Sequence, residues 1–187
     1  MAAAAEWLEG ARPRTLPTAI APVLAGTAIA ITDGGARWGL AALCLVVALG
    51  LVIGVNFAND YSDGVRGSDG EDRVGPLRLV GSGLAEPSHV RVAAFACFAV
   101  SAVAGLVITI MTGHWWFIAV GVVCILAAWF YTGGSHPYGY AGLGEIFVFI
   151  FFGLVAVGGT IYVQTDHVGA AGWVTACLIG PTPCGVL

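Results

Sequence analysis

Lysine is missing from this 187-residue chain, and only 10% of its residues carry a charged side chain. Soluble domains have about 25% charged residues, which cover much of the surface that faces water. Hydrophobic residues make up 58% of the chain, and the mean hydropathy is +0.90. These proportions exclude a soluble globular enzyme.

The basic residues and the cysteines argue against two further classes of protein, nucleic-acid-binding proteins and proteins held together by disulfides or cysteine-bound metals. The formal net charge is −4, and the seven basic residues form no run, which argues against nucleic-acid binding. The five cysteines contain no C-x-x-C pair, and Cys44, Cys97 and Cys124 lie inside long apolar runs. Cysteines in such runs usually act as small apolar residues. We therefore expect neither a disulfide framework nor a cysteine metal cluster.

Long apolar runs predict an all-α fold, a single bundle of transmembrane helices over residues 1–187. A membrane-spanning helix needs about 20 mainly apolar residues. A sixth run opens near Ala170, but Trp173 to Gly180 is roughly 12 Å of helix, too short for a hydrocarbon core of about 30 Å. The full spans are expected at Thr15–Thr32, Trp38–Ala58, Val92–Met111, Trp115–Tyr131 and Leu143–Gln164.

The arginines predict the orientation of this bundle in the lipid bilayer. Six of the seven lie before the first span or between the second and third, and Arg37 alone lies on the other side. Positive side chains accumulate on the cytoplasmic side. We therefore expect a multi-pass protein of the cell membrane, with a cytoplasmic N-terminus and a cytoplasmic loop over residues 59–91. That loop holds six acids and four arginines, so chemistry is expected there.

A polar stripe is predicted at the end of the second span. Asn56, Asn59, Asp60 and Asp63 follow the i, i+3, i+4, i+7 rule, so on a continued helix they lie within an arc of roughly 100°. Carboxylates at a helix C-terminus oppose the macrodipole and repel each other. A cation would relieve both effects, and these oxygen ligands suit Mg²⁺ bound together with substrate phosphates. Alternatively, the groups are simply hydrated where the helix leaves the membrane.

Arginines follow the stripe in a glycine-rich segment. Arg66, Arg73 and Arg78 are the three in question. Glycine lets the backbone approach an anion closely, and guanidinium binds phosphate through two parallel hydrogen bonds. Carboxylates, Mg²⁺ and arginines together are the parts of a diphosphate site. Alternatively, each arginine only satisfies the charge bias of a cytoplasmic loop.

Three blocks of the chain resemble the UbiA superfamily of intramembrane prenyltransferases. The first is G-A-R-P-R-T-L-P at 10–17. The second is N-x-x-N-D-Y-x-D at 56–63, followed by G-P-L-R-L-V-G-S-G-L at 75–84. The third is Y-T-G-G at 131–134, which runs on to G-L-G-E at 142–145. The blocks are similar to the branch that prenylates 1,4-dihydroxy-2-naphthoate in menaquinone synthesis, and the similarity extends to about Ile179.

The resemblance implies an activity and a set of site residues. The activity is Mg²⁺-dependent transfer of a polyprenyl group from its diphosphate to 1,4-dihydroxy-2-naphthoate, with loss of CO₂, to give demethylmenaquinone. By resemblance, Asp60 and Asp63 are catalytic and hold the metal with Asn56, and Asp69 is a further candidate ligand. Asn59 lies beside them, and the arginines at 66, 73 and 78 contact the diphosphate or the acceptor.

Tyr131 ends the fourth predicted span on the cytoplasmic side, and Glu145 begins the fifth span on the same side. A tyrosine ring can stabilise a prenyl cation or pack against the acceptor, so Tyr131 is a candidate catalytic residue and Glu145 a candidate substrate contact. Alternatively, Tyr131 anchors the helix at the membrane interface and Glu145 reaches the lipid headgroups. His136, Tyr138 and Tyr140, between them, are interpreted as ordinary loop residues.

The chain departs from the family at its C-terminal end. Family members continue into further spans and a second Asp-rich motif, so we interpret the chain as truncated and expect it to fold poorly or to be inactive by itself. One alternative is a transporter or channel subunit whose acidic mouth gathers divalent cations. A permeation path needs polar groups at mid-membrane depth, and the middles of the third and fourth spans carry no charge. Another alternative is a non-catalytic remnant. The oligomeric state stays open.

Overall fold

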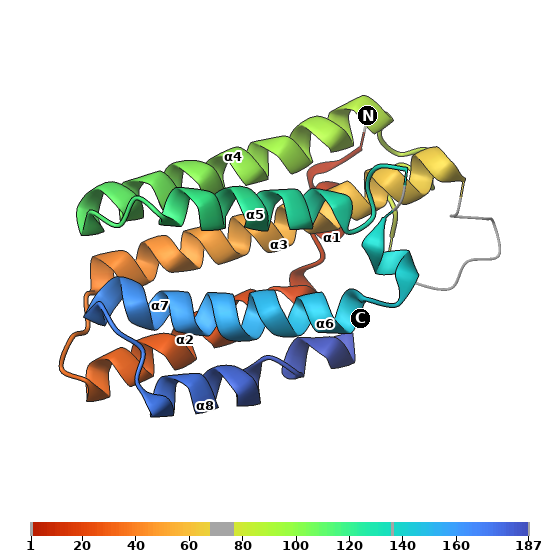
Figure 1. Cartoon of the computed structure of the whole chain (residues 1–187). Helices are drawn as coiled ribbons and strands as arrows, with labels where there is room; N and C mark the ends of the chain where they lie inside the picture. Colours follow the sequence, from red (N-terminus) through yellow and green to blue (C-terminus); the bar gives the residue numbers. More distant parts are fainter. Residues whose placement is uncertain (1, 68–76, 136, 187) are drawn as a thin grey trace.

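The computed structural model describes residues 2–67, 77–135 and 137–186. Within these ranges it is helical and has no strand, which confirms the all-α prediction (Figure 1). The elements are α1 (Ala4–Gly10), the 3-10 turn η1 (Pro13–Thr15), α2 (Pro17–Thr32), α3 (Trp38–Arg66), α4 (Pro87–Thr112), α5 (Phe117–Phe130), the 3-10 turn η2 (Tyr138–Ala141), α6 (Gly144–Val148), the π-helical segment η3 (Phe149–Val155), α7 (Ala156–Thr165), α8 (Ala170–Ile179) and η4 (Thr182–Val186).

Fewer helices are long enough to cross a membrane than predicted. In the described residues, α3, α4 and the continuous run Gly144–Thr165 qualify, and α1–η1 with α2 make a fourth if this pair, bent by 48°, counts as one span. The prediction of five full spans is therefore wrong. Helix α5 has only 14 residues, because Trp115 and Trp116 precede its first turn instead of joining it.

Helix α3 continues beyond the predicted end of the second span. It runs through Asn59 to Arg66 and ends at Gly67, whose φ of 69° places it in the left-handed region that glycine adopts without steric cost. Helix α4 begins at Pro87. The loop predicted over 59–91 is therefore too long at both ends, and the polar stripe lies on a helix, as its spacing requires.

Close packing of α3 against α4 organises one side of the bundle. Gly50 and Gly54 form a G-x-x-x-G pair on α3, a pattern that lets membrane helices approach each other closely. A Cβ atom on Gly54 would lie 2.6 Å from Cδ1 of Phe98, and one on Gly50 would lie 3.0 Å from the Cys97 carbonyl oxygen. The Ser101 hydroxyl donates a hydrogen bond across the interface to the Val47 carbonyl, at 3.1 Å.

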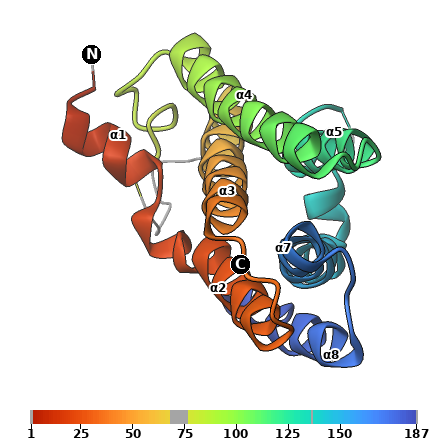
Figure 2. The same cartoon turned by 90° about the vertical axis from the view of Figure 1, so that its left-hand side faces the viewer.

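The other helices enclose a space beside α3. Seen end-on, α3 stands between α4 and α2, while α5 and α7 lie on one side of it (Figure 2). Helix α2 packs against both α7 and α8. At the end opposite the polar stripe, Gln164 fastens α7 to the start of α3, because its Oε1 accepts a hydrogen bond from the Arg37 N–H at 3.0 Å.

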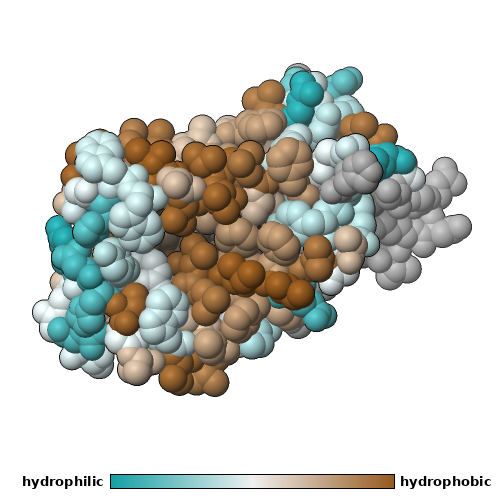
Figure 3. Space-filling view, viewed as in Figure 1, coloured by the Kyte–Doolittle hydropathy of each residue, from teal (hydrophilic) through white to brown (hydrophobic). Residues whose placement is uncertain are grey.

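The outer surface is apolar around the middle of the bundle. Figure 3 shows hydrophobic residues gathered over the central part of one face, with hydrophilic residues toward its ends. On α4, Val100, Val103 and Ile110 are each more than half exposed. A wide apolar belt of this kind is the surface of a protein embedded in a lipid bilayer.

Candidate functional site

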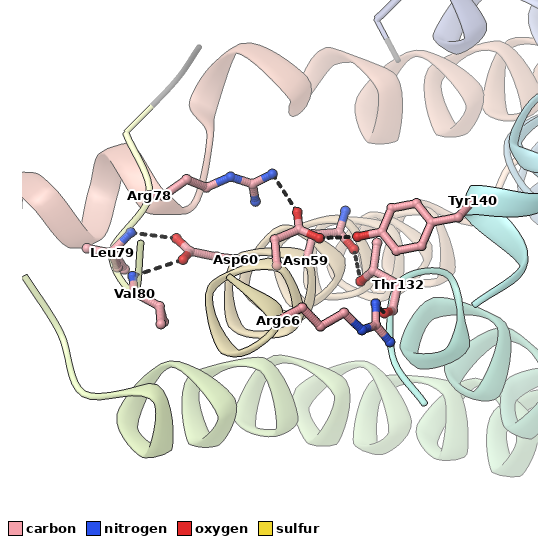
Figure 4. A network of polar contacts seen from close by, with 9 residues as sticks. Asn59, Asp60, Arg66, Arg78, Leu79, Val80, Thr132 and Tyr140 are labelled. Atoms are coloured by element: carbon pink, nitrogen blue, oxygen red, sulfur yellow. Dashed lines mark hydrogen bonds and ion pairs between the residues drawn. The ribbon is translucent and has the colours of Figure 1, made fainter. Parts of the chain in front are cut away.

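Asp60 is buried near the C-terminal end of α3, and each of its carboxylate oxygens binds the backbone of a distant segment. Its two carboxylate oxygens accept hydrogen bonds from the N–H groups of Leu79, at 2.7 Å, and Val80, at 3.0 Å (Figure 4). Only 1% of the residue is exposed. Asp60 therefore anchors the chain where it returns to the bundle before α4, and it is not simply hydrated.

Asp63, one turn further along, joins two segments of the chain. One oxygen pairs with Nη2 of Arg78 at 2.8 Å, and the other accepts a short hydrogen bond from the Tyr140 hydroxyl. The guanidinium of Arg66 lies 5.6 Å from the centre of the Tyr140 ring. Arg78 thus relieves part of the repulsion and dipole penalty that a cation was predicted to relieve.

Asn59 and Arg66 attach the end of α5 to α3. The Thr132 hydroxyl donates to Oδ1 of Asn59 at 2.7 Å. The Arg66 guanidinium donates to the carbonyl oxygens of Thr132, at 2.5 Å, and Gly134. Arg66 was predicted to contact diphosphate. In the structure its guanidinium instead binds backbone carbonyl oxygens and positions the turn that follows α5.

Asn56, the first member of the stripe, fastens the N-terminal segment. Its Nδ2 donates to the Ala11 carbonyl and to the Thr15 hydroxyl oxygen, both at 2.9 Å. Between these two contacts lies Arg12, whose backbone is left-handed, with φ 54° and ψ 69°. The polar residues of the stripe therefore bind three separate parts of the chain, namely residues 11–15, the segment 78–80 and the region after α5.

A cavity of about 560 Å³ lies inside the bundle. Side chains of α2, α3, α4, α5, η3 and α7 line it, and most of them are apolar. A large apolar cavity with a few polar groups is the usual form of a small-molecule site. Its polar end is formed mainly by Arg12, Thr15, Asn56, Asn59, Tyr131 and Tyr138.

The structure divides the predicted site residues into three groups. Asn56, Asn59 and Tyr131 line the cavity, whereas Asp60, Asp63, Arg66 and Arg78 form the adjoining network around residues 77–80 and 132–140. Glu145 is exposed in the first turn of α6, where a negative charge suits the helix dipole. Asp69 and Arg73 lie outside the described residues.

The described part of the chain brings no three His, Cys, Asp or Glu side chains close enough to hold a metal ion together. The predicted donors are nevertheless of the right chemical type, because carboxylate and amide oxygens suit Mg²⁺. A carboxylate has about four lone-pair sites, so the contacts of Asp60 and Asp63 leave room for further ligands.

Comparison with known proteins decides the family. Residues 19–184 match the UbiA prenyltransferase family. The chain belongs to this family. The match covers the polar stripe, the cavity-lining helices and the turn after α5, so the geometry above is that of a UbiA family member.

Several curated relatives carry the same name. The chain is 57% identical to the 1,4-dihydroxy-2-naphthoate octaprenyltransferase of Mycobacterium tuberculosis over 187 residues, which is all of this chain and 63% of the relative. It is 38% identical to the Escherichia coli protein of the same name over 186 residues, 97% of this chain and 59% of that protein. The corresponding Bacillus subtilis protein is 31% identical over 157 residues, 84% of this chain and 50% of that protein.

The chain therefore spans less than two thirds of the length of these UbiA relatives. No solved structure matches it.

Two tyrosines of this UbiA chain have contacts that the sequence did not indicate. Tyr138 and Tyr140 were interpreted as ordinary loop residues, and the structure places both in the turn η2 with specific partners. Tyr138 lines the cavity and donates to the Ala127 carbonyl at 2.7 Å, while Tyr140 binds Asp63. A usable signal was present, because both lie inside the third block that resembles the family. His136 lies outside the described residues.

Replacing Tyr140 with phenylalanine is expected to remove a pH-dependent contribution to stability. Burial of the hydroxyl, and then its hydrogen bond to Asp63, raise the pKa of Tyr140. A raised pKa in the folded state means that the contribution is complete below the unfolded value of about 10 and is lost as the pH rises through the folded value. Since 58% of Tyr140 is exposed, the loss should be no more than about 1 kcal/mol.

Thermal unfolding between pH 7 and 11 measures this effect. Tyr140→Phe should unfold slightly earlier at pH 7, and the difference from the unmodified chain should vanish at high pH. Tyr162→Phe, in α7 and far along the chain from Asp63, is the matched control. An equal difference at every pH would contradict the assignment.

Proposed function

We propose that this chain acts in Mg²⁺-dependent transfer of a polyprenyl group from polyprenyl diphosphate to 1,4-dihydroxy-2-naphthoate, with loss of CO₂, to give demethylmenaquinone in its reduced, hydroquinone form. The observation that carries the proposal is the apolar cavity of about 560 Å³ whose polar end includes Asn56 and Asn59 of the Asp-rich stripe. The names of the relatives support the acceptor, since they specify that naphthoate.

The cavity suits a prenyl tail and a reactive carbon at its polar end. Cleavage of the allylic C–O bond leaves negative charge on the diphosphate and positive charge on the prenyl carbon. Apolar walls exclude water, which would otherwise capture the cation. Tyr131 lines the same end and offers a ring face to the cation or to the acceptor.

The diphosphate is proposed to bind beside the stripe. Asn56, Asp60 and Asp63 would hold Mg²⁺ there, with Asp69 as a further ligand. When bound, the metal neutralises negative charge on the leaving group. Arg78 lies 2.8 Å from Asp63, so it can share in the charge neutralisation. Arg73 is a further proposed contact.

The acceptor ring attacks the prenyl carbon through the ring carbon that carries its carboxylate. A C–C bond forms there as the C–O bond to diphosphate breaks. Loss of CO₂ then returns the electron pair of the carboxylate bond to the ring and restores its aromaticity. The protein's part is to hold both reactants in place and to exclude water.

The proposed location is the cell membrane, with the N-terminus and the connection between α3 and α4 on the cytoplasmic side. The arginine distribution supports this orientation. A water-soluble acceptor would then reach the polar end of the cavity from the cytoplasm, while the prenyl chain would come from the bilayer.

Ligand binding by the purified chain in lipid nanodiscs tests the proposal. Geranylgeranyl diphosphate should bind more tightly with Mg²⁺ than with EDTA, and Asp63→Asn should reduce this gain at least tenfold, because it removes one ligand charge. Asp33→Asn, an exposed position after α2, is the control and should bind normally. Binding that is indifferent to Mg²⁺ would refute the proposed diphosphate site.

A further inference from the structure

An exposed arginine lies in the second turn of α4, at the end of the bundle that carries the polar stripe. This residue is Arg91, and the start of α4 lies at the same end as the last turns of α3 (Figure 1). No charged residue follows it on α4. The helix from Arg91 to Thr112 is about 32 Å long, which matches a hydrocarbon core of about 30 Å. Arg91 therefore lies at the level where the apolar part of a bilayer meets the lipid headgroups.

The guanidinium of Arg91 lies over an aromatic ring. Its central carbon is 5.7 Å from the centre of the Tyr61 ring on α3, which is within the range of a cation–π contact. None of the carboxylates that the structure describes forms an ion pair with Arg91. A guanidinium that lies over a ring keeps the N–H groups in its own plane available for an anion.

The Tyr61 ring belongs to a row of aromatic side chains that leads to the outer surface of the bundle. Tyr61 stacks on Trp129 of α5 with centroids 6.1 Å apart, and Trp129 packs on Phe95 of α4 with centroids 4.7 Å apart. Phe95 lies one helical turn after Arg91, and 48% of it is exposed. The row holds Tyr61 in place from two other helices, and it connects the guanidinium to an apolar surface.

A cationic group above an apolar surface at this depth matches the two parts of a phospholipid. The guanidinium can bind the phosphate of the headgroup through two parallel hydrogen bonds. Val92, Phe95 and Val103 are exposed along α4 and offer apolar contacts to the acyl chains. A headgroup with a net negative charge is favoured over a zwitterionic one, because the cation of a zwitterionic headgroup repels Arg91.

We propose that Arg91, Tyr61 and the adjoining exposed face of α4 form a binding site for one anionic phospholipid. Arg91 binds the headgroup phosphate, Tyr61 holds the guanidinium, and the acyl chains lie along α4. The inference goes beyond the proposed function, because neither Arg91 nor Tyr61 is among the described residues that line the cavity.

Native mass spectrometry of the full chain in detergent tests this site, because it separates protein molecules by the number of lipids bound. The probes are dioleoyl phosphatidylglycerol, which is anionic, and dioleoyl phosphatidylcholine, which is zwitterionic. For the first lipid bound, phosphatidylglycerol should bind about fivefold more tightly, the gain expected from one basic residue at an anionic headgroup. In Arg91→Gln this ratio of affinities should fall below about twofold, because the guanidinium is lost.

Three further variants serve as controls. Arg14→Gln removes another exposed positive charge from the chain and should keep the ratio of the unmodified chain. Tyr61→Leu removes the ring beneath the guanidinium and should lower the ratio, whereas Tyr61→Phe keeps the ring and should keep the ratio. Circular dichroism of every variant checks that the helices are retained. If Arg91→Gln does not fold, the comparison of Tyr61→Leu with Tyr61→Phe provides the test.

Several results would overturn the inference. They are equal affinity of the unmodified chain for both lipids, an unchanged ratio in Arg91→Gln or in Tyr61→Leu, and an equal loss of preference in Arg14→Gln. A further probe is glycerol 3-phosphate, which carries the phosphate without acyl chains and should bind far more weakly than phosphatidylglycerol. If it binds to the chain as tightly as the lipid does, the guanidinium is a site for a free phosphate and the lipid assignment is wrong.

Discussion

Asp60→Ala is expected to lower the free energy of unfolding by about 2–5 kcal/mol. The substitution leaves the N–H groups of Leu79 and Val80 without the carboxylate that accepts them. Leu79 is fully buried, so water cannot replace the lost acceptor without opening the site, and each orphaned donor costs about 1–3 kcal/mol. Chemical unfolding in detergent measures the change.

A second readout of Asp60→Ala locates the damage. Arg78 is 8% exposed and directly precedes the segment that Asp60 anchors, so trypsin should cleave after Arg78 faster in the variant. Asp33→Ala is the control, because Asp33 is exposed and its replacement should change stability by less than about 0.5 kcal/mol. Equal effects of the two substitutions would show that the hydrogen bonds of Asp60 add no more to stability than an exposed aspartate does.

Gly54→Ala is expected to destabilise the bundle by about 1–3 kcal/mol, and Gly54→Leu to prevent α3 from packing on α4. The added Cβ would lie 2.6 Å from Cδ1 of Phe98, a ring that is itself 2% exposed and has no space into which to move. Interiors are packed too densely to absorb such an overlap without a backbone shift. Thermal unfolding in detergent measures the loss.

Gly39→Ala provides a control of opposite sign on the same helix. A Cβ atom on Gly39 meets nothing within 4 Å, so the substitution should be neutral or stabilise α3 by up to about 1 kcal/mol through helix propensity. If Gly39→Ala and Gly54→Ala shift the unfolding temperature alike, close packing at Gly54 is not the cause of its effect.

Local patterns were sufficient to predict most of the helices and the polar face of α3. Apolar runs located α3 and α4, because burial in lipid requires long stretches of hydrophobic residues. The i, i+3, i+4, i+7 spacing placed Asn56, Asn59, Asp60 and Asp63 on one face, because a helix turns by a fixed angle per residue. The same reasoning overestimated α5, since hydropathy does not reveal that Trp115 and Trp116 stay outside the helix.

The contacts of that face could not be predicted in the same way. Asp60 finds its donors 19 residues away, Asp63 binds a tyrosine 77 residues away, and Asn56 holds a segment 45 residues before it. Each of these pairings depends on how separate helices pack, and nothing in the local spacing specifies it.

The sequence by itself determined that this protein is a helical membrane protein of the UbiA family, with an amide and carboxylate stripe at the end of a long apolar helix. Hydrophobicity and helical period are properties of neighbouring residues, so they can be seen without a fold. Only the tertiary structure decided that Arg66 binds backbone carbonyls, that Tyr140 joins Asp63, and that Arg12 enters the cavity wall. These roles follow from which donors and acceptors meet when distant segments pack, because a buried polar group takes the partner that the fold brings within reach.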